Sequence, residues 1–416
     1  MFGARLHAGL WSQSTTLRSD QRGSAVSGAL TLSRIRLRRT FYWLAGGQTA
    51  RVAKPLVIAV LLAVGCRPPI TIYNQVESRP QAVGCVPDTC GDPERLISIT
   101  YLGVSGLLIE HHGHVLLTAP FFSNPSLAMV RPRLTRLLRS SPRISADTQA
   151  IDKMLPRSAD RATAILVGHG HYDHLMDIPF IATKRATTAR IYGAPSVRHM
   201  LMGDSALRSN GGQRVVAISA TAAGTRERLG VWYYTEDSAY RFMALIAGHA
   251  PTFRDGKRSY TFTAGSVDVD LDSLPHTAAE WKLGEPYAYL IDVLAAGTRE
   301  PAFRIYFQDA PSEPPLGFPP SELLAERAVD LAVLCAATSS NVSNTPDSLL
   351  AVLKPRQVIV AHWEDFFRSQ TLPTQLSPAT DLHAFRKSLG KTLPRSAGWV
   401  MPLPQTTFRF RETGAA

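Results

Sequence analysis

The chain carries, at residues 169–174, the sequence His-Gly-His-Tyr-Asp-His, directly after an apolar run at 164–168. Four potential metal ligands therefore follow a predicted buried strand. Residues two apart in extended chain point to the same side, so His169 and His171 are placed to bind one ion. Asp173 and His174 lie past the bend and are placed to hold a second. Neutral imidazole and carboxylate ligands suit zinc, manganese or ferrous iron.

A surface loop that happens to be rich in histidine is the alternative interpretation of this stretch. The chain has 12 histidines in 416 residues, and three of them fall within H-x-H-x-D-H at the end of one apolar run. That coincidence is improbable without a function, so the motif predicts a metal site.

Three more residues that can bind metal follow apolar runs in the C-terminal half. His249 follows residues 244–248, Asp309 follows 304–308 and His362 follows 358–361. A single histidine or aspartate at a strand end is usually a cap or a solvated loop residue. The repetition of one placement at four strand ends predicts that these side chains share a pocket.

Hydrophobic periodicity predicts a chain of mixed strands and helices. The expected strands lie at 97–102, 107–110, 115–118, 164–168, 190–192, 214–218, 242–246, 287–293, 303–307, 331–334 and 358–360. The expected helices lie at 148–155, 175–184, 321–328, 346–353 and 380–389. Strands first, followed by strands mixed with helices, favour two sheets covered by helices.

The first predicted hairpin, the H-x-H-x-D-H signature and the order of the later ligands resemble the metallo-β-lactamase superfamily of metal-dependent hydrolases. The resemblance covers roughly residues 96–410. It implies an α/β fold of the four-layer αβ/βα sandwich type and two divalent metal ions, zinc before manganese or iron. Carried over by position, it assigns His169, His171 and His249 to one ion, Asp173, His174 and His362 to the other, and Asp309 to both.

Residues 168–175 and 360–363 look most like the branch that contains N-acylphosphatidylethanolamine phospholipase D and the UlaG-like lactonase group. The resemblance implies a hydroxide, activated by two metals and oriented by Asp173, that attacks an ester-type bond of a small or lipid-like substrate. A phosphodiester is favoured over a lactone, and Asp309 disfavours β-lactam hydrolysis. The alternatives are a di-iron redox member of the fold and a surface lipoprotein that binds without catalysis.

The sequence departs from the family pattern at Ala119-Pro120, where relatives carry Asp-Pro, so an aspartate that orients the histidine loop is missing. Asp177 is expected to be a hydrogen-bond acceptor or a cap rather than a ligand. Four aromatic residues near the predicted metal loops either form an apolar lip for the substrate or pack beneath the loops: Phe121, Phe122, Phe318 and Trp363.

The net charge of +12 is concentrated at the N-terminus, because residues 1–67 contribute +9 of it. The basic character therefore belongs to a leader and does not indicate a nucleic-acid partner. Residues 56–65 form an uncharged run of signal-peptide length that ends at Cys66. This resembles a bacterial lipoprotein signal, in which Cys66 is lipidated and anchors the mature protein to a membrane of the cell envelope.

The predicted organisation is a leader over 1–66, a tether over 67–95 and a hydrolase domain over 96–416. Residues 1–50 are long for an export signal, which indicates a start codon assigned too early; an organellar transit peptide or a cytoplasmic protein is the alternative. In an exported chain Cys85 and Cys90 are close enough in sequence to form a local disulfide. Cys335, within an apolar run, is expected to be a buried thiol.

Overall fold

The computed structural model describes residues 72–73, 77–78, 83–85, 95–130, 141–255, 258–261 and 263–413. All of them belong to the compact unit that begins at Pro68. The predicted leader, Cys66 and Cys90 lie outside the described residues, so lipidation and the pairing of Cys90 stay predictions. Cys85 takes part in a disulfide. Cys335 is a free, buried thiol, as predicted.

The N-terminal half of the unit forms a seven-stranded mixed sheet. Its strands are, in spatial order, β19 (Thr406–Arg411), β3 (Leu96–Gly103), β4 (Gly106–His111), β5 (His114–Thr118), β6 (Ala162–Leu166), β7 (Arg190–Gly193) and β8 (Val215–Ala217). The strands from β5 to β8 are parallel, so their carboxyl ends lie at one edge. The last strand of this sheet in sequence, β19, is an edge strand and pairs with the first, β3.

The C-terminal half forms an eight-stranded mixed sheet. Its strands are, in spatial order, β2 (Glu77–Ser78), β18 (Gly398–Met401), β16 (Gln357–Ala361), β15 (Leu331–Cys335), β14 (Pro301–Gln308), β13 (Tyr287–Leu294), β10 (Tyr240–Ile246) and β9 (Tyr233–Tyr234). Two small sheets pair β1 (Ile72–Tyr73) with β17 (Thr374–Gln375) and β11 (Phe253–Asp255) with β12 (Arg258–Tyr260). Parts of the predicted tether, β1 and β2, thus pair with strands of the domain.

Alternation along the strands of the eight-stranded sheet separates two hydrophobic cores. On β14, Phe303, Ile305 and Phe307 belong to the core shared with the seven-stranded sheet, whereas Tyr306 belongs to a second core. That second core also contains residues of α8 (Ser321–Glu326), α9 (Asp347–Leu353) and α10 (Leu382–Thr392). The eight-stranded sheet therefore has one face on the other sheet and one face on helices.

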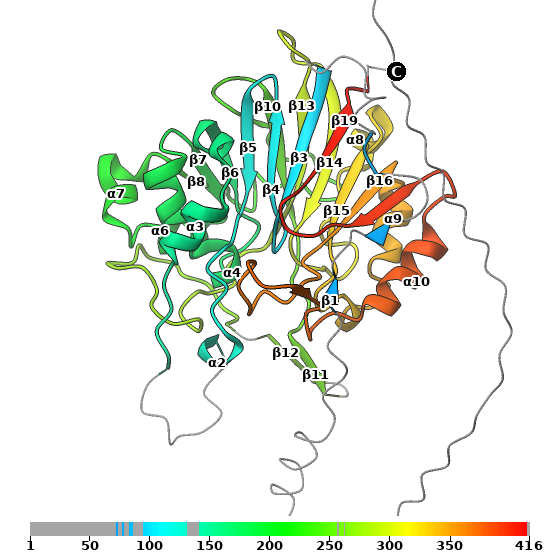
Figure 1. The fold of residues 1–416 in the computed structure, drawn as a ribbon. Helices are drawn as coiled ribbons and strands as arrows, with labels where there is room; N and C mark the ends of the chain where they lie inside the picture. Colours follow the sequence, from blue (N-terminus) through cyan, green and yellow to red (C-terminus); the bar gives the residue numbers. More distant parts are fainter. Residues whose placement is uncertain are drawn as a thin grey trace, which may run out of the picture. The chain divides into compact units, whose positions relative to one another are not determined.

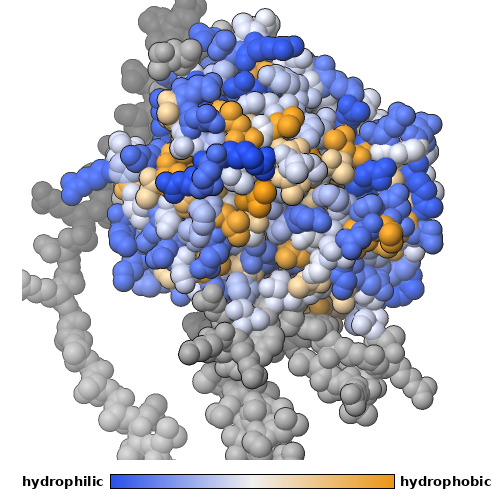
Figure 2. Space-filling view, turned by 180° about the vertical axis from the view of Figure 1, so that it is seen from behind, coloured by the Kyte–Doolittle hydropathy of each residue, from blue (hydrophilic) through white to orange (hydrophobic). Residues whose placement is uncertain are grey.

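Helices α3 (Thr148–Met154) and α6 (Pro195–Leu201) add buried residues to the shared core. Figure 1 shows α3, α6 and α7 (Ser205–Arg208) on one side of the paired sheets and α8, α9 and α10 on the other. The order helix, sheet, sheet, helix confirms the predicted four-layer αβ/βα sandwich. The face drawn in Figure 2 is mainly hydrophilic, with hydrophobic residues in scattered groups. Within the described part of the chain, no helix has the length and apolar character needed to cross a membrane.

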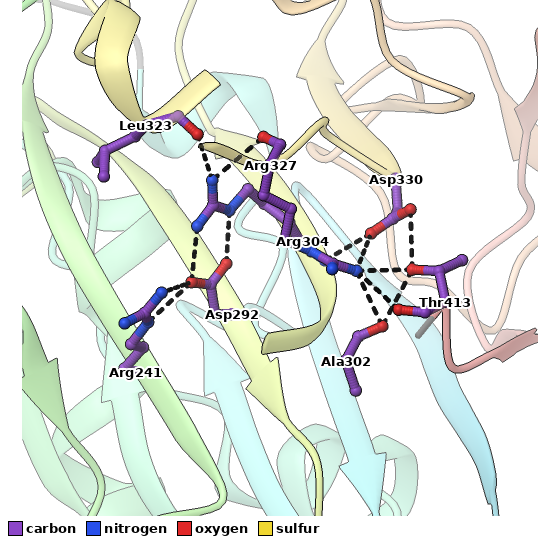
Figure 3. Close-up of polar contacts among 8 residues, drawn as sticks. All are labelled: Arg241, Asp292, Ala302, Arg304, Leu323, Arg327, Asp330 and Thr413. Atoms are coloured by element: carbon purple, nitrogen blue, oxygen red, sulfur yellow. Dashed lines mark hydrogen bonds and ion pairs between the residues drawn. The ribbon is translucent and has the colours of Figure 1, made fainter. Parts of the chain in front are cut away.

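A row of three charged side chains crosses the helix-covered face of the eight-stranded sheet (Figure 3). Asp292 is paired in register with Arg241 on one side and with Arg304 on the other. The Arg304 guanidinium is completely buried; it donates to both Asp292 oxygens at 2.7 and 2.9 Å and to the Leu323 carbonyl of α8 at 2.6 Å. The row therefore links β10, β13 and β14 and ties α8 to the sheet.

We predict that Asp292→Ala lowers the free energy of unfolding by about 3–5 kcal/mol, because two arginines then lose the anion that compensates their burial. Urea denaturation measures this loss. The matched control is Lys391→Ala, which removes an exposed ion pair with Asp347 and is expected to cost less than about 1 kcal/mol. Equal losses in the two variants would contradict the role given to the buried row.

Candidate metal centre

The seven predicted ligands all lie just past strand ends at one edge of the paired sheets. His169 and His171 follow β6, and the short helix α4 (Tyr172–Leu175) carries the next two. The remaining three follow β10, β14 and β16. Strands β10 and β14 both run antiparallel to β13, and β14, β15 and β16 are parallel. Because these strands share one direction, their carboxyl ends meet at one edge, as the sequence predicted.

The first predicted ligand group, His169, His171 and His249, is assembled. The ring centroid of His249 lies 4.9 Å from that of His169 and 4.8 Å from that of His171. The His169 Nε2 and His171 Nδ1 atoms are 3.1 Å apart. One ligand atom from each histidine lies within 4.8 Å of the others. His249 is the only partly exposed member, so this group faces the accessible side of the centre.

The second predicted group, Asp173, His174 and His362, is assembled in the same way. The Asp173 Oδ2 atom lies 3.3 Å from His362 Nε2 and 3.6 Å from His174 Nε2. All three side chains are buried, and their ligand atoms lie within 4.8 Å of one another.

Asp309 lies between the two groups. Its Oδ1 atom is 3.2 Å from His169 Nδ1, in the first group, and its Oδ2 atom is 3.7 Å from His174 Nδ1, in the second. The Asp309 side chain is 2% exposed. One carboxylate therefore touches both groups with separate oxygens, which is the position that a bridging ligand requires.

Burial lowers the pKa of four imidazoles of the centre and keeps them neutral: His169, His171, His174 and His249. Burial lowers the pKa of His169 and His171 well below the ordinary value and lowers that of His174 to about 3. Burial alone would raise the pKa of Asp173, but the neighbouring His174 and His362 hold it below the usual range. For Asp309 burial dominates and raises the pKa. Neutral imidazoles with free lone pairs beside an ionised carboxylate are the states in which these groups bind metal.

The donor set fits divalent metal ions. Four buried polar atoms of the centre have no hydrogen-bond partner among the described residues: His171 Nε2, His174 Nδ1, Asp309 Oδ2 and His362 Nδ1. Buried polar atoms are normally satisfied, because an unpaired one costs free energy. Five imidazoles and two carboxylates whose free atoms converge in this way match the ligands of zinc, manganese or iron.

Close backbone packing positions the histidine loop. A Cβ atom at Gly168 would collide with the Asp309 carboxylate, and one at Gly170 would collide with the Lys282 carbonyl. The Gly168 carbonyl accepts a 2.7 Å hydrogen bond from the Tyr287 N–H of the other sheet. Gly168, just before the motif, and Gly170, within it, therefore let the loop approach its neighbours closely. The sequence analysis did not use these glycines.

A buried tyrosine–glutamate pair, missed by the sequence analysis, positions His362. The Tyr101 hydroxyl lies 2.8 and 2.7 Å from the two Glu364 oxygens and accepts the His362 N–H at 2.9 Å. Glu364 also accepts the Val104 N–H at 2.6 Å. Both His362 and Val104 have left-handed φ angles, of 53° and 49°, which cost energy in residues other than glycine. The Glu364 carboxylate thus stabilises the strained backbone at Val104 directly and that at His362 through Tyr101. Its position two residues after His362 is the feature of the sequence that could have indicated this role.

The aromatic lip considered from the sequence is not formed by the residues named for it. Phe121, Phe122, Phe318 and Trp363 are 0–4% exposed and belong to the cores. They correspond to the other alternative, packing beneath the loops. One partly exposed aromatic residue beside the ligands is Phe366, whose ring centroid lies 4.8 Å from that of His362.

No protein-family model matches this sequence, and no curated protein matches it. Solved structures resemble the chain, among them Igni18, a metallo hydrolase from Ignicoccus hospitalis, at 15% identity, with 76% of this chain and 99% of that one covered and a TM-score of 0.43. The metallo-β-lactamase fold protein YhfI from Bacillus subtilis is 12% identical over 76% of this chain and 99% of that one, with a TM-score of 0.41. CmlA, a diiron β-hydroxylase from Streptomyces venezuelae, is 14% identical, with 77% of this chain and 55% of that one covered and a TM-score of 0.41. At these identities and TM-scores, none of the likenesses assigns an activity to this chain.

We predict that Gly168→Ala lowers the affinity for metal by about 10- to 100-fold, the range seen when a residue that orients a ligand is changed. The added methyl group displaces the Asp309 carboxylate. Metal titration of the purified variant measures the loss. Gly390→Ala is the control, because an added Cβ at this helical position meets nothing within 4 Å. Unchanged affinity in Gly168→Ala would contradict the close contact with Asp309.

Proposed function

We propose that this protein is a metal-dependent hydrolase with a dinuclear centre, acting on an ester-type bond and preferring a phosphodiester to a lactone or carboxylic ester. The residues that would hold the ions are those of the two groups described above, with Asp309 shared between them. When bound, two divalent ions lower the pKa of water and polarise the oxygen atoms of the bond that is cleaved.

The observation that carries the proposal is the position of Asp309 between the two histidine groups. A carboxylate that touches both groups would hold two cations close together, which is the arrangement of many phosphoryl-transfer and hydrolytic sites. Such a pair suits an in-line displacement at phosphorus, because both the attacking and the leaving oxygen then face positive charge. This favours the phosphodiester within the ester class.

We assign Asp173 a second role, as the group that orients the attacking water. Its carboxylate is ionised, since its pKa is held below the usual range, and it lies in the second ligand group beside His362. An ionised carboxylate accepts hydrogen bonds with both oxygens. It is therefore suited to hold a water molecule in one orientation.

We predict that His249→Ala and His362→Ala each lower metal content and turnover by removing a ligand from one group only. Asp309→Ala is expected to weaken the binding of both ions, because this side chain contacts both groups. Elemental analysis and steady-state kinetics measure these effects. His199→Ala, which removes a histidine paired with Asp270 on the surface, is the control. Full turnover in Asp309→Ala would contradict the shared ligand.

The second test compares substrates. We predict that the zinc- or manganese-loaded protein hydrolyses a chromogenic phosphodiester with a higher kcat/KM than a lactone, and that a chromogenic cephalosporin is the poorest of the three. Rapid cephalosporin turnover with an inert phosphodiester would overturn this ranking. Iron in the purified protein with a visible absorbance band would instead favour a redox function for the same residues.

A further inference from the structure

A second cluster of metal-binding residues lies outside the centre described above. His111, His112 and Glu412 each offer a ligand atom within 4.8 Å of the others. The His111 Nε2 atom is 2.9 Å from Glu412 Oε1, and His112 Nε2 is 3.5 Å from the same oxygen. The side chains of His111 and Glu412 are 1% and 9% exposed, and that of His112 is 26% exposed. His111 is thus buried, Glu412 is partly buried and His112 is exposed, so the cluster is accessible from the side of His112.

The hairpin between β4 and β5 brings the two histidines together. His111 pairs with His114, so the turn consists of His112 and Gly113, and both have positive φ angles, of 49° and 80°. Two central residues with positive φ define the type I′ turn, which prefers asparagine followed by glycine. In this turn the His112 ring folds against that of His111, with ring centroids 4.0 Å apart. Adjacent residues of an extended strand would point to opposite faces.

The C-terminal strand supplies the carboxylate. Glu412 directly follows β19, which pairs with β3 next to β4. The cluster lies where β4 ends and β5 begins, that is, at the amino end of β5. Since β5 is parallel to β6, and β6 leads to the histidine motif, the cluster lies at the other end of the sheet from the seven ligands. The two sites therefore share no residue.

We propose that His111, His112 and Glu412 form a separate mononuclear site for a divalent transition-metal ion, with Zn²⁺ as the expected ion. Two imidazoles and one carboxylate are a known zinc ligand set that leaves a fourth position for water. The ion would connect the β4–β5 hairpin to the end of the C-terminal strand and so hold β19 in the sheet.

The protonation states at neutral pH suit this ligand set. Burial, together with the neighbouring His112, lowers the pKa of His111, so its ring is neutral. Burial alone would raise the pKa of Glu412, but Arg95 and His111 hold it below the usual range, so the carboxylate is ionised. Arg95 contacts the other oxygen, Oε2, at 3.0 Å and leaves Oε1 to the histidines. The competing interpretation is a hydrogen-bonded clasp of arginine, glutamate and histidine that holds no metal.

The decisive variant is His112→Asn, because it removes one ligand while giving the turn the Asn-Gly pair that it prefers. Wild type and variant are dialysed against buffered Zn²⁺, and the zinc bound per chain is measured by elemental analysis. We expect the variant to bind about one Zn²⁺ fewer than the wild type. We also expect Zn²⁺ to raise the thermal unfolding midpoint of the wild type more than that of the variant, since an ion bound only by the folded state stabilises it.

Two further variants complete the test. Glu412→Gln keeps the size of the side chain and removes its charge, so it is expected to lose the same equivalent of zinc. His114→Asn is the control, because this histidine on the same hairpin bonds to Asp237 and not to the cluster. The measurement is a difference between chains that all keep the seven other ligands, so it stands even if that centre binds one ion or none. Equal zinc in the wild type, His112→Asn and Glu412→Gln would overturn the proposal and leave the clasp.

Discussion

The contact of the Asp309 carboxylate with one histidine from each ligand group is the interaction on which the candidate centre depends. Five imidazoles and two carboxylates are mostly buried at one sheet edge, where each unpaired polar atom costs free energy. Among themselves these groups satisfy only part of their hydrogen-bonding capacity, and four buried atoms have no partner among the described residues. Some other interaction must offset the free energy that these unpaired atoms cost the folded state. Metal binding to the folded state is an interaction that this donor set can make.

Contacts between the two sheets keep the cluster together. The Tyr289 hydroxyl, on the eight-stranded sheet, donates to the Val167 carbonyl at the start of the histidine loop at 2.8 Å. The Tyr287 N–H donates to the Gly168 carbonyl one residue further on. These two hydrogen bonds join the sheets at the edge where the ligands lie, and so fix the residues after β6 relative to those after β10, β14 and β16. The core between the sheets and the centre at its end are one structural unit.

Much of the fold, and the convergence of the seven candidate ligands, could be predicted from local sequence. Alternation and apolar runs located β3 to β8, β10 and β13 to β16, but not the short strands β9, β11 and β12. The same runs located the candidate ligands, because each group of them begins directly after a run. Pairing between distant segments could not be predicted. Apolar and polar residues alternate at 406–411, which indicates a strand but not the strand it pairs with. The pairing of β19 with β3 and the contact of Glu412 with His111 could therefore not be predicted. The role of Glu364 was missed for the same reason, since its partner Tyr101 is 263 residues away.

The contacts of Asp177 tie the segment after β5 to the segment that carries the histidine motif. Asp177, three residues after the last ligand of the histidine motif, is completely buried and accepts the N–H groups of Phe122 and Ser123 at 2.7 and 3.0 Å. Burial raises its pKa to about 6, against the opposing effect of these hydrogen bonds. The segment after β5 and the helical segment that carries Asp173 and His174 are thus tied together by a carboxylate. This carboxylate comes from the helical segment. The two segments are therefore joined although Ala119 stands where the resemblance of the sequence led us to expect an aspartate.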